Sequence, residues 1–185
     1  MNKITAFSVL VLLGAASAHA ADWKSDPAGS TLEFIATFEG NPVPGSFKDF
    51  DTQLRLDPAS PAAGSLAVTV KVTSADMKIA DVNKEIQNKT WFDYAGFPRA
   101  EFRSNELRRV DGDHYVARGT LSLKGAQQPV DVPFTFTTGA GDAAMDGELT
   151  VKRGPFGIGT GEWAKADEIG ADVKVKFKVR LVKAD

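Results

Sequence analysis

The amino-acid sequence predicts an all-β fold, an eight-stranded antiparallel barrel with one short helical insertion. Polar and apolar residues alternate with period two over most of the chain, which is typical of strands with one buried face. Turn-forming residues separate these runs at hairpin-like spacing. The alternation gives way between Asp81 and Ser104, where a helix-like pattern is followed by a cluster of aromatic residues. Antiparallel sheets of this size close into barrels or fold into sandwiches, and we favour the barrel.

The first 20 residues are expected to be a secretory signal peptide. Lys3 gives the positively charged n-region, and residues 4–13 form a mostly apolar h-region. Ala18-His19-Ala20 has the small residues that signal peptidase needs at its cleavage site. The apolar run is too short to span a membrane, and no cysteine follows it that could carry a lipid. The sequence therefore predicts cleavage after Ala20, a periplasmic or secreted protein, and one domain over residues 21–185.

Charge and cysteine content exclude several classes of protein. Without the leader, which holds one Lys and no acidic residue, 21 basic and 24 acidic side chains remain, a net charge of −3. That balance does not suit nucleic acid or an anionic membrane as partner. The chain has no cysteine, so hydrophobic burial rather than disulfides must hold the exported domain together.

The eight predicted strands are read from alternation along the chain. The last strand shows the clearest alternation. Its apolar residues on one face are Val173, Val175, Phe177, Val179 and Leu181, and its basic residues on the other face are Lys174, Lys176, Lys178 and Arg180. Trp23 to Pro27 is read as a lead-in, and Asn41 to Gly45 as a turn or irregular corner because of its two prolines. Asp111-Gly112 predicts a hairpin turn. The strands cover residues 31–38, 50–56, 66–73, 100–104, 115–123, 130–136, 145–151 and 173–181.

The helical insertion begins near Asp81. Ile79, Val82 and Ile86 fall at helical spacing, with polar residues between them. Five aromatic residues follow within twelve positions, from Trp91 to Phe102, around Gly96 and Pro98. We expect this segment either to cover an open end of the barrel or to line a cavity within it.

Catalytic chemistry finds little support. His114 is the one histidine after the leader, and it lies beside a predicted hairpin turn, where a surface position is the simpler interpretation. One histidine and no cysteine do not make a zinc site or a nucleophile with its base. The acidic residues near Asp142 and near Asp111 lack EF-hand spacing and are read as solvated turn carboxylates, although a carboxylate pair assembled in space stays open. We predict no catalytic and no metal-binding residues.

The glycine-rich run from Gly154 to Gly161 resembles a phosphate-binding loop only superficially. It lacks the Gly-Lys-Ser/Thr ending and does not open a predicted helix, so a bulged strand or barrel corner is the better interpretation. The aromatic residues leave two alternatives open. They either fill the core or line an apolar tunnel, because rigid rings can hold a cavity open and pack against alkene or alkyl chains.

An ordered set of short motifs makes the chain similar to the YceI-like family over nearly the whole length after the leader. The motifs are Asp26-Pro27, Ser30, Phe34, Gly45-Ser46-Phe47, Phe50, Ser74, Asp76, Trp91-Phe92-Asp93, Phe97-Pro98, Phe102, Gly119 to Gly125, Pro129-Val130, Arg153 and Phe156 to Gly159. Two positions depart from the family pattern. Glu85-Ile86 stands where the family often has His-Leu, and Pro155 stands where it has an acidic or polar residue, so the head-group preference is expected to differ if these positions meet the ligand.

The resemblance implies an exported, lipocalin-like barrel that holds a polyisoprenoid, an isoprenoid quinone or a fatty amide, non-covalently and without a further cofactor. It also implies links to acid, base or osmotic stress, and as partners a cytochrome b561-type membrane protein or a second copy in a homodimer. Arg153 and Asp76 are the expected polar contacts to the head group, and the alternative for both is a role as structural ion-pair partners. The expected ligand-binding residues are Phe34, Phe38, Phe50, Asp76, Trp91, Phe92, Phe97, Phe102, Phe134, Phe136, Arg153, Phe156, Ile158 and Trp163. The alternative function is a stress-induced interaction protein with a filled core and no ligand.

Overall fold

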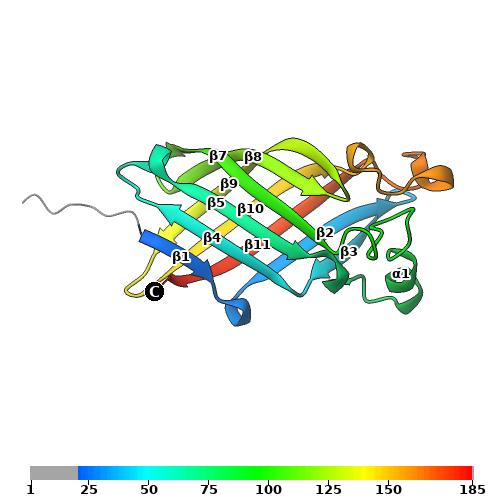
Figure 1. The fold of residues 1–185 in the computed structure, drawn as a ribbon, viewed down its shortest axis with the longest axis horizontal. Coiled ribbons are helices and arrows are strands. Elements are labelled where there is room, and N and C mark those ends of the chain that lie inside the picture. Colours follow the sequence, from blue (N-terminus) through cyan, green and yellow to red (C-terminus); the bar gives the residue numbers. More distant parts are fainter. Residues whose placement is uncertain (1–20, 185) are drawn as a thin grey trace, which may run out of the picture.

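A computed structural model describes residues 21–184, and the expected signal peptide lies outside these described residues. The strands form an elongated barrel with the short helix α1 (Ala80–Glu85) at one end, while β1 and the C-terminus lie at the other (Figure 1). The strands are β1 (Ala21–Ser25), β2 (Thr31–Phe38), β3 (Asn41–Phe47), β4 (Phe50–Leu56), β5 (Ser65–Lys71), β6 (Ala75–Asp76), β7 (Arg99–Asp111), β8 (His114–Leu123), β9 (Ala126–Thr138), β10 (Asp142–Lys152) and β11 (Asp172–Lys183). Single 3₁₀ turns cover Pro27–Gly29, Pro61–Ala63, Val72–Ser74, Gly154–Phe156 and Gly161–Ala164.

The eleven strands make eight positions around a closed antiparallel barrel. β1 pairs with β11 and β4, whereas β2, its continuation along the chain, pairs with β11 and β3. Likewise β3 continues into β4, and β5 into β6, which pairs with β3. Counted as β1/β2, β3/β4, β5/β6 and then β7 to β11, the barrel has eight long strands, of which three are broken. The predicted eight-stranded barrel is therefore confirmed.

Two segments that the sequence analysis left out of the strands belong to the barrel. β1 was expected to be a lead-in and β3 a turn, and both expectations were wrong. Pro42 and Pro44 pair with Thr37 and Ile35 of β2, but the other edge of β3 pairs with β6 only through Ser46 and Phe47. Because prolines are tolerated where no ladder donor is needed, this edge accommodates both. The actual turn is Glu39-Gly40, where both residues have positive φ.

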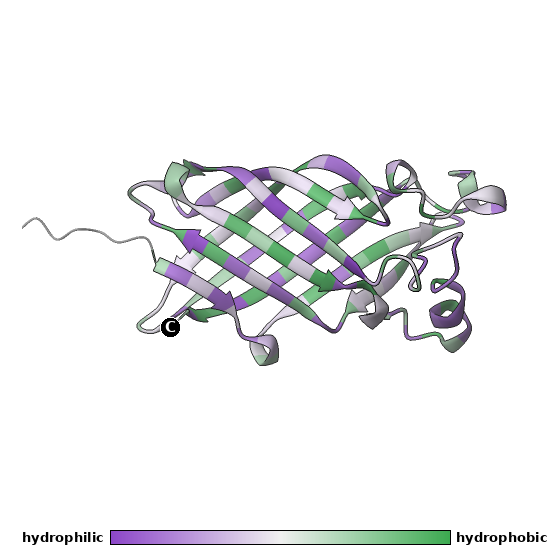
Figure 2. Cartoon of the chain, in the orientation of Figure 1, coloured by the Kyte–Doolittle hydropathy of each residue, from purple (hydrophilic) through white to green (hydrophobic). Residues whose placement is uncertain are grey.

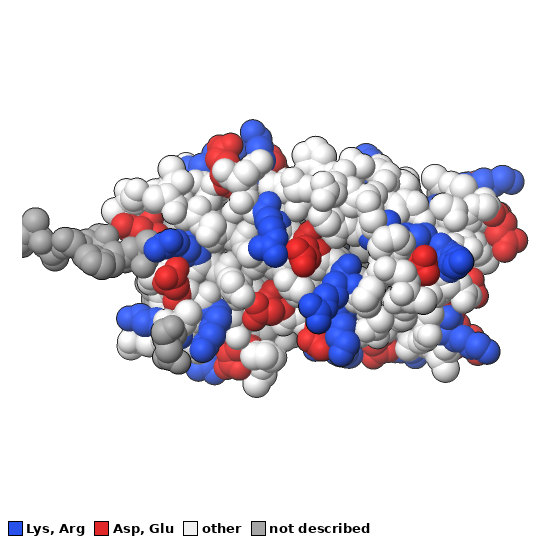
Figure 3. Space-filling model, viewed as in Figure 1, with Lys and Arg blue, Asp and Glu red and all other residues white. Residues whose placement is uncertain are grey.

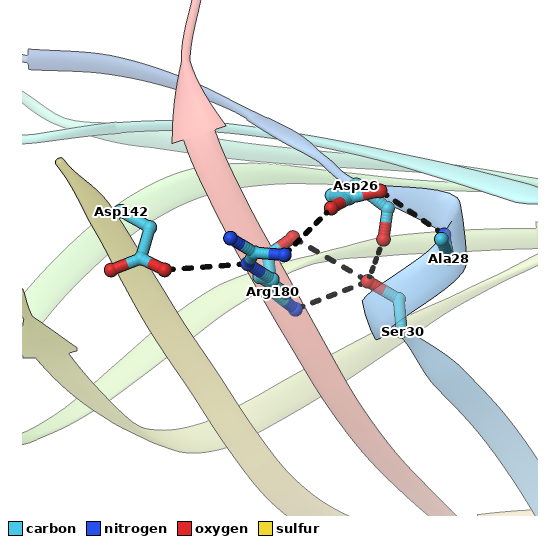
Figure 4. A network of polar contacts seen from close by, with 5 residues as sticks. All are labelled: Asp26, Ala28, Ser30, Asp142 and Arg180. Atoms are coloured by element: carbon cyan, nitrogen blue, oxygen red, sulfur yellow. Dashed lines mark hydrogen bonds and ion pairs between the residues drawn. The ribbon is translucent and has the colours of Figure 1, made fainter.

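A polar network holds the break between β1 and β2 (Figure 4). The Ser30 hydroxyl donates to the Asp26 carbonyl oxygen at 2.6 Å and accepts from the Arg180 backbone N–H at 3.1 Å. The Arg180 guanidinium lies 3.2 Å from Asp26 Oδ2 and 3.3 Å from Asp142 Oδ2. The chain therefore leaves the β1 position and re-enters the sheet as β2 while both halves stay attached to β11.

Ser30→Ala is expected to lower the free energy of unfolding by about 1 kcal/mol, because it removes one donated and one accepted hydrogen bond at the break. Ser60→Ala is the matched control, since Ser60 is exposed and its side chain makes no capping hydrogen bond. Urea unfolding of both variants measures the difference. Equal midpoints for the two variants would contradict the role of Ser30.

The interior is divided into two apolar clusters. Figure 2 shows hydrophobic and hydrophilic residues alternating along the strands, as the period-two pattern predicts. The larger cluster extends from the cavity wall to the end of the barrel that holds β1, and that end is filled by Trp23, Leu54, Leu107, Tyr115 and Leu181. We call this the packed end. A smaller cluster around Phe34, Met77 and Ile86 lies at the opposite end, beneath the segment that connects β6 to β7.

The outer surface carries both signs of charge. Figure 3 shows basic and acidic side chains interspersed along one barrel face. On β11, Lys174 and Lys176 both pair with Glu148 of β10, at 2.9 and 3.3 Å. No helix among residues 21–184 is both long enough and apolar enough to cross a membrane.

Candidate functional site

An apolar cavity of about 240 Å³ lies inside the barrel, between the packed end and the segment 77–98. We call residues 77–98 the lid segment and residues 153–171, between β10 and β11, the lid loop. All eight strand positions contribute to the cavity wall. Its side chains are apolar or aromatic except for those of Thr52, Glu101 and Arg153.

Eight of the fourteen predicted site residues line this cavity. They come from five separate stretches of the chain, which the barrel brings together around one space. Phe156 and Ile158 are nearly fully buried, so these two residues of the glycine-rich run form part of the wall. The eight are Phe34, Phe50, Trp91, Phe92, Phe102, Arg153, Phe156 and Ile158.

Phe134 and Phe136 do not line the cavity, although both were expected to. They point into the packed end, where Phe134 stacks on Tyr115 at 5.6 Å and Phe136 meets the edge of Trp23 at 5.9 Å. Both are almost fully buried. The alternation of β9 correctly predicts that both side chains point into the barrel. Whether an inward side chain packs in the core or lines the cavity depends on its position along the barrel axis, which alternation does not give.

Three further aromatic residues lie outside the cavity wall. Phe38 and Phe97 are exposed by 41% and 36%, and the Phe97 ring packs against the Lys124-Gly125 turn instead. Trp163 sits behind the wall with its ring centroid 6.0 Å from that of Trp91.

Arg153 lines the cavity, but its guanidinium already has its partners. Nε donates to the Gly170 carbonyl, and Nη1 to the carbonyls of Ile158 and Gly159. Nη2 donates to the carbonyls of Trp163 and Ile169. Since arginine has five N–H donors, all of them are used to hold the lid loop closed. While the lid loop is closed, the guanidinium therefore has no donor left for a head group, and its partners are backbone carbonyls rather than a carboxylate. The expected head-group contact of Arg153 stays a prediction.

Asp76 also lies off the cavity wall and anchors the lid segment. Its Oδ1 accepts from Asn83 Nδ2 at 3.1 Å and from the Lys78 backbone N–H at 2.8 Å, and Lys48 lies 3.7 Å from Oδ2. The hydrogen bond from Asn83, followed by those of the Lys78 backbone and the charge of Lys48, lowers the pKa of the Asp76 carboxyl below its usual 3.8. The carboxylate thus ties β6 to the start of α1.

Acidification is expected to weaken this anchor. Because the folded pKa of Asp76 is lowered, its contribution to stability is present above pH 3.8 and is lost as pH falls through the folded value. Asp76→Asn is therefore expected to show a shallower loss of stability below pH 3.8 than the parent protein. Urea midpoints measured across this range test it, with Asn83→Ala expected to act in the same direction. Identical slopes for all three proteins would contradict the assignment.

The lid segment and the lid loop are fastened to each other. The backbone N–H groups of Gly159 and Thr160 both donate to the Thr90 carbonyl. Lys124 Nζ, at the turn between β8 and β9, donates to the carbonyls of Lys89 and Gly157, and burial lowers the pKa of this ammonium group. The two segments therefore close the end of the barrel opposite the packed end.

Two details of the lid segment differ from expectation. Ile79 precedes α1 with extended backbone and is 52% exposed, so of the three predicted helical positions only Val82 and Ile86 face inward. Glu85, at the position where the related family often has His, is exposed and accepts from Asn88 Nδ2 at 3.0 Å. It does not reach the cavity wall, and Pro155 is likewise exposed.

Most of the aliphatic side chains in the cavity wall were not predicted as site residues, unlike the aromatic ones. Leucine and valine side chains from six strands face the cavity, as do Met77 and Met145. The signal was present in the inward phase of each alternating run, which marks these positions. Members of this set include Leu32, Val68, Val70, Leu121, Leu123, Val130, Leu149, Val151, Val173 and Val175.

Fold and site together define the class, a closed antiparallel β-barrel that encloses one apolar cavity beneath a lid. The model of the YceI-like domain matches residues 23–181, and the chain belongs to this family. It is 32% identical over 159 residues to a UPF0312 protein of Yersinia pestis, covering 81% of this chain and 82% of that one. It is 36% identical over 123 residues to the UPF0312 protein plu2095 of Photorhabdus laumondii, covering 65% and 64%.

Solved structures share the fold. BcnA of Burkholderia cenocepacia matches with a TM-score of 0.82 at 33% identity, covering 84% of this chain and 98% of that one. A polyisoprenoid binding domain from Saccharophagus degradans, implicated in plant cell wall breakdown, matches with a TM-score of 0.71 at 15% identity over 89% and 99% of the two chains. At that identity the likeness shows the fold alone.

Proposed function

We propose that this protein binds one long apolar molecule, such as a polyisoprenoid, an isoprenoid quinone or a fatty amide, in the barrel cavity and keeps it out of water. The observation that carries the proposal is the cavity inside the barrel, whose wall is almost wholly apolar. The fold shared with a polyisoprenoid binding domain supports it. The export signal expected at residues 1–20 would place this carrier or store in the periplasm.

The energetics favour an occupied cavity. At about 24 cal/mol per Å³ of unfilled volume, a space of 240 Å³ corresponds to a cost on the order of 6 kcal/mol. Each CH₂ group transferred from water contributes about 0.8 kcal/mol, so a chain of modest length offsets that cost. The volume disfavours the alternative of an interaction protein with a filled core.

The size of the cavity also limits how a ligand is held. Ligand pockets commonly span about 300–1,000 Å³, so 240 Å³ lies below that range. A chain as long as C40 therefore requires the wall or the lid to move, or leaves part of the chain outside. We propose that the lid segment and the lid loop separate when such a chain enters.

Filling the cavity with a larger side chain tests the proposal. Val68→Phe adds a ring at the wall, and we expect it to abolish uptake of geranylgeraniol while the melting temperature changes little, because an existing void takes the ring. Val110→Phe is the matched control at an exposed position. In a filled core the same ring would cost about 1–3 kcal/mol. A destabilised Val68→Phe variant with unchanged uptake would overturn the proposal.

A further inference from the structure

Two of the broken strand positions are neighbours in the barrel, and the ladder between them is interrupted. The β1–β4 ladder ends at Lys24 and Gln53, and the β2–β3 ladder begins only at Leu32 and Phe47. Between these two ladders, no strand pair in the described part of the chain joins the β1/β2 position to the β3/β4 position. We call this interval in the barrel wall the seam.

The backbone on each side of the seam bonds away from it. On one side, the turn between β1 and β2 is bound to β11 (Figure 4), and the Asp26 N–H donates to the Arg180 carbonyl at 2.8 Å. On the other side, the Lys48 N–H donates to the Ser74 carbonyl at 3.2 Å. The wall is therefore held on both flanks of the seam, whereas strand hydrogen bonds do not close the seam itself.

A groove of about 330 Å³ lies over the seam on the outside of the barrel. Thr31, Glu33 and Ile35 of β2 line it, and they alternate with residues that point into the barrel. Residues at both edges of the seam border this outer groove as well as the cavity, so a single layer of residues separates the two spaces there. These residues are Leu32, Phe47 and Phe50.

The outer groove is amphipathic. Ile35 and Pro44 give it apolar surface, whereas Glu33, Lys48 and Lys78 give it charges of both signs. An apolar chain that enters the groove keeps part of its surface covered, and a polar end there keeps its water and escapes the desolvation cost of the cavity. The groove therefore suits the part of a chain at which apolar carbon gives way to a polar end.

The outer groove also adjoins the lid segment. Met77 lines the cavity, and Lys78, the next residue of the lid segment, lines the groove. The carboxylate of Asp76 holds this point, since its Oδ1 accepts from the Lys78 backbone N–H at 2.8 Å. A movement of the lid segment would therefore widen the cavity and the groove together, and a chain could pass between them sideways rather than end-on.

We propose that a bound chain longer than the cavity crosses the barrel wall at the seam, and that its polar end lies in the outer groove beside Lys48 and Lys78. This proposal rests on the proposed function and adds where the surplus length and the polar end of the ligand lie. The cavity of about 240 Å³ is smaller than common ligand pockets of about 300–1,000 Å³. The groove adds about 330 Å³ directly beside it.

Single cysteines test the path of the chain, because the protein has no cysteine of its own. An environment-sensitive fluorophore is attached to Lys48→Cys in the groove, to Glu162→Cys on the lid loop, or to Lys183→Cys at the packed end, all exposed positions. The probes are geraniol, a short isoprenoid alcohol, and solanesol, a long one. We expect solanesol to shift the emission of the Lys48→Cys label to shorter wavelength and geraniol to leave it unchanged. Neither alcohol should shift the other two labels.

Lys48→Trp tests the outer groove without a label. The indole fills part of the groove, so we expect solanesol to bind about tenfold more weakly, because a few of its carbon atoms can no longer be buried. The affinity for geraniol, which fits inside the barrel, should stay unchanged. Lys183→Trp is the matched control at the packed end and should bind both alcohols as the parent protein does.

Three results would overturn the crossing at the seam. They are a solanesol shift at Glu162→Cys instead of Lys48→Cys, an equal shift at Lys48→Cys with geraniol, and parental solanesol affinity in Lys48→Trp. In each case the alcohols still bind, so the proposed function stands and this inference fails. If neither alcohol binds the parent protein, the proposed function fails and the inference fails with it.

Discussion

Phe136→Ala is expected to lower the free energy of unfolding by about 3–5 kcal/mol, the range for removing a large aromatic side chain from a packed core. Phe136 is 3% exposed and contacts both Trp23 and Tyr115 through edge-on ring packing. It does not line the cavity, so the fraction that remains folded should bind an apolar ligand with unchanged affinity.

Phe50→Ala is the matched comparison for Phe136→Ala, because Phe50 is half-buried and lies on the cavity wall. We expect this variant to lose less stability and to change ligand affinity. Urea unfolding compares the stability of the two variants, and ligand titration compares their affinity for an apolar ligand. The reverse result, a mild loss with altered binding for Phe136→Ala, would place the cavity at the wrong end of the barrel.

Arg153→Met is expected to release the lid loop. The substitution keeps an apolar stem but leaves the carbonyl oxygens of Ile158, Gly159, Trp163, Ile169 and Gly170 without their donor. Each buried acceptor left unpaired costs about 1–3 kcal/mol. The open loop, in which water hydrates these carbonyl oxygens, therefore has a lower free energy than the closed loop. Hydrogen exchange is expected to speed up over residues 153–171 while the strands stay protected.

Arg118→Met provides the control for Arg153→Met. Arg118 makes two hydrogen bonds with Asp131, at 2.9 and 3.0 Å, but both side chains are about half exposed. Exposed ion pairs contribute about 0–1 kcal/mol to stability. The Arg118–Asp131 pair joins strands β8 and β9 and does not hold a loop. If Arg153→Met exchanges no faster in the lid loop than Arg118→Met does, Arg153 does not hold the loop closed.

The alternating pattern predicted the barrel because each long strand has one buried and one solvated face. β11 shows this most directly, since its lysines are exposed and Phe177, Val179 and Leu181 are buried. The breaks at residues 26–30 and 48–49 could not be predicted, because they depend on register between strands and on Arg180, which is 150 residues away from Ser30. The prolines of β3 misled local reasoning because an edge with few partners tolerates them.

The candidate site could be predicted only in part, because the alternating pattern holds only some of the information that places a residue in the cavity wall. Alternation tells which side chains point inward, and so it found Phe34, Phe50 and Phe102 correctly as wall residues. It does not tell how far along the axis a residue lies, and Phe134 and Phe136 were therefore misplaced. Polar residues such as Arg153 and Asp76 bond to backbone and side-chain groups in loops that sequence spacing does not reveal.

The central claim, that the cavity holds a long apolar chain, is tested most directly by native mass spectrometry of the protein after export in a bacterial host. We expect a one-to-one adduct that organic solvent releases and that is identified as a long apolar chain, such as a polyisoprenoid or an isoprenoid quinone. A clean ligand-free mass that stays unchanged after incubation with geranylgeraniol and geranylgeranylacetone would contradict it.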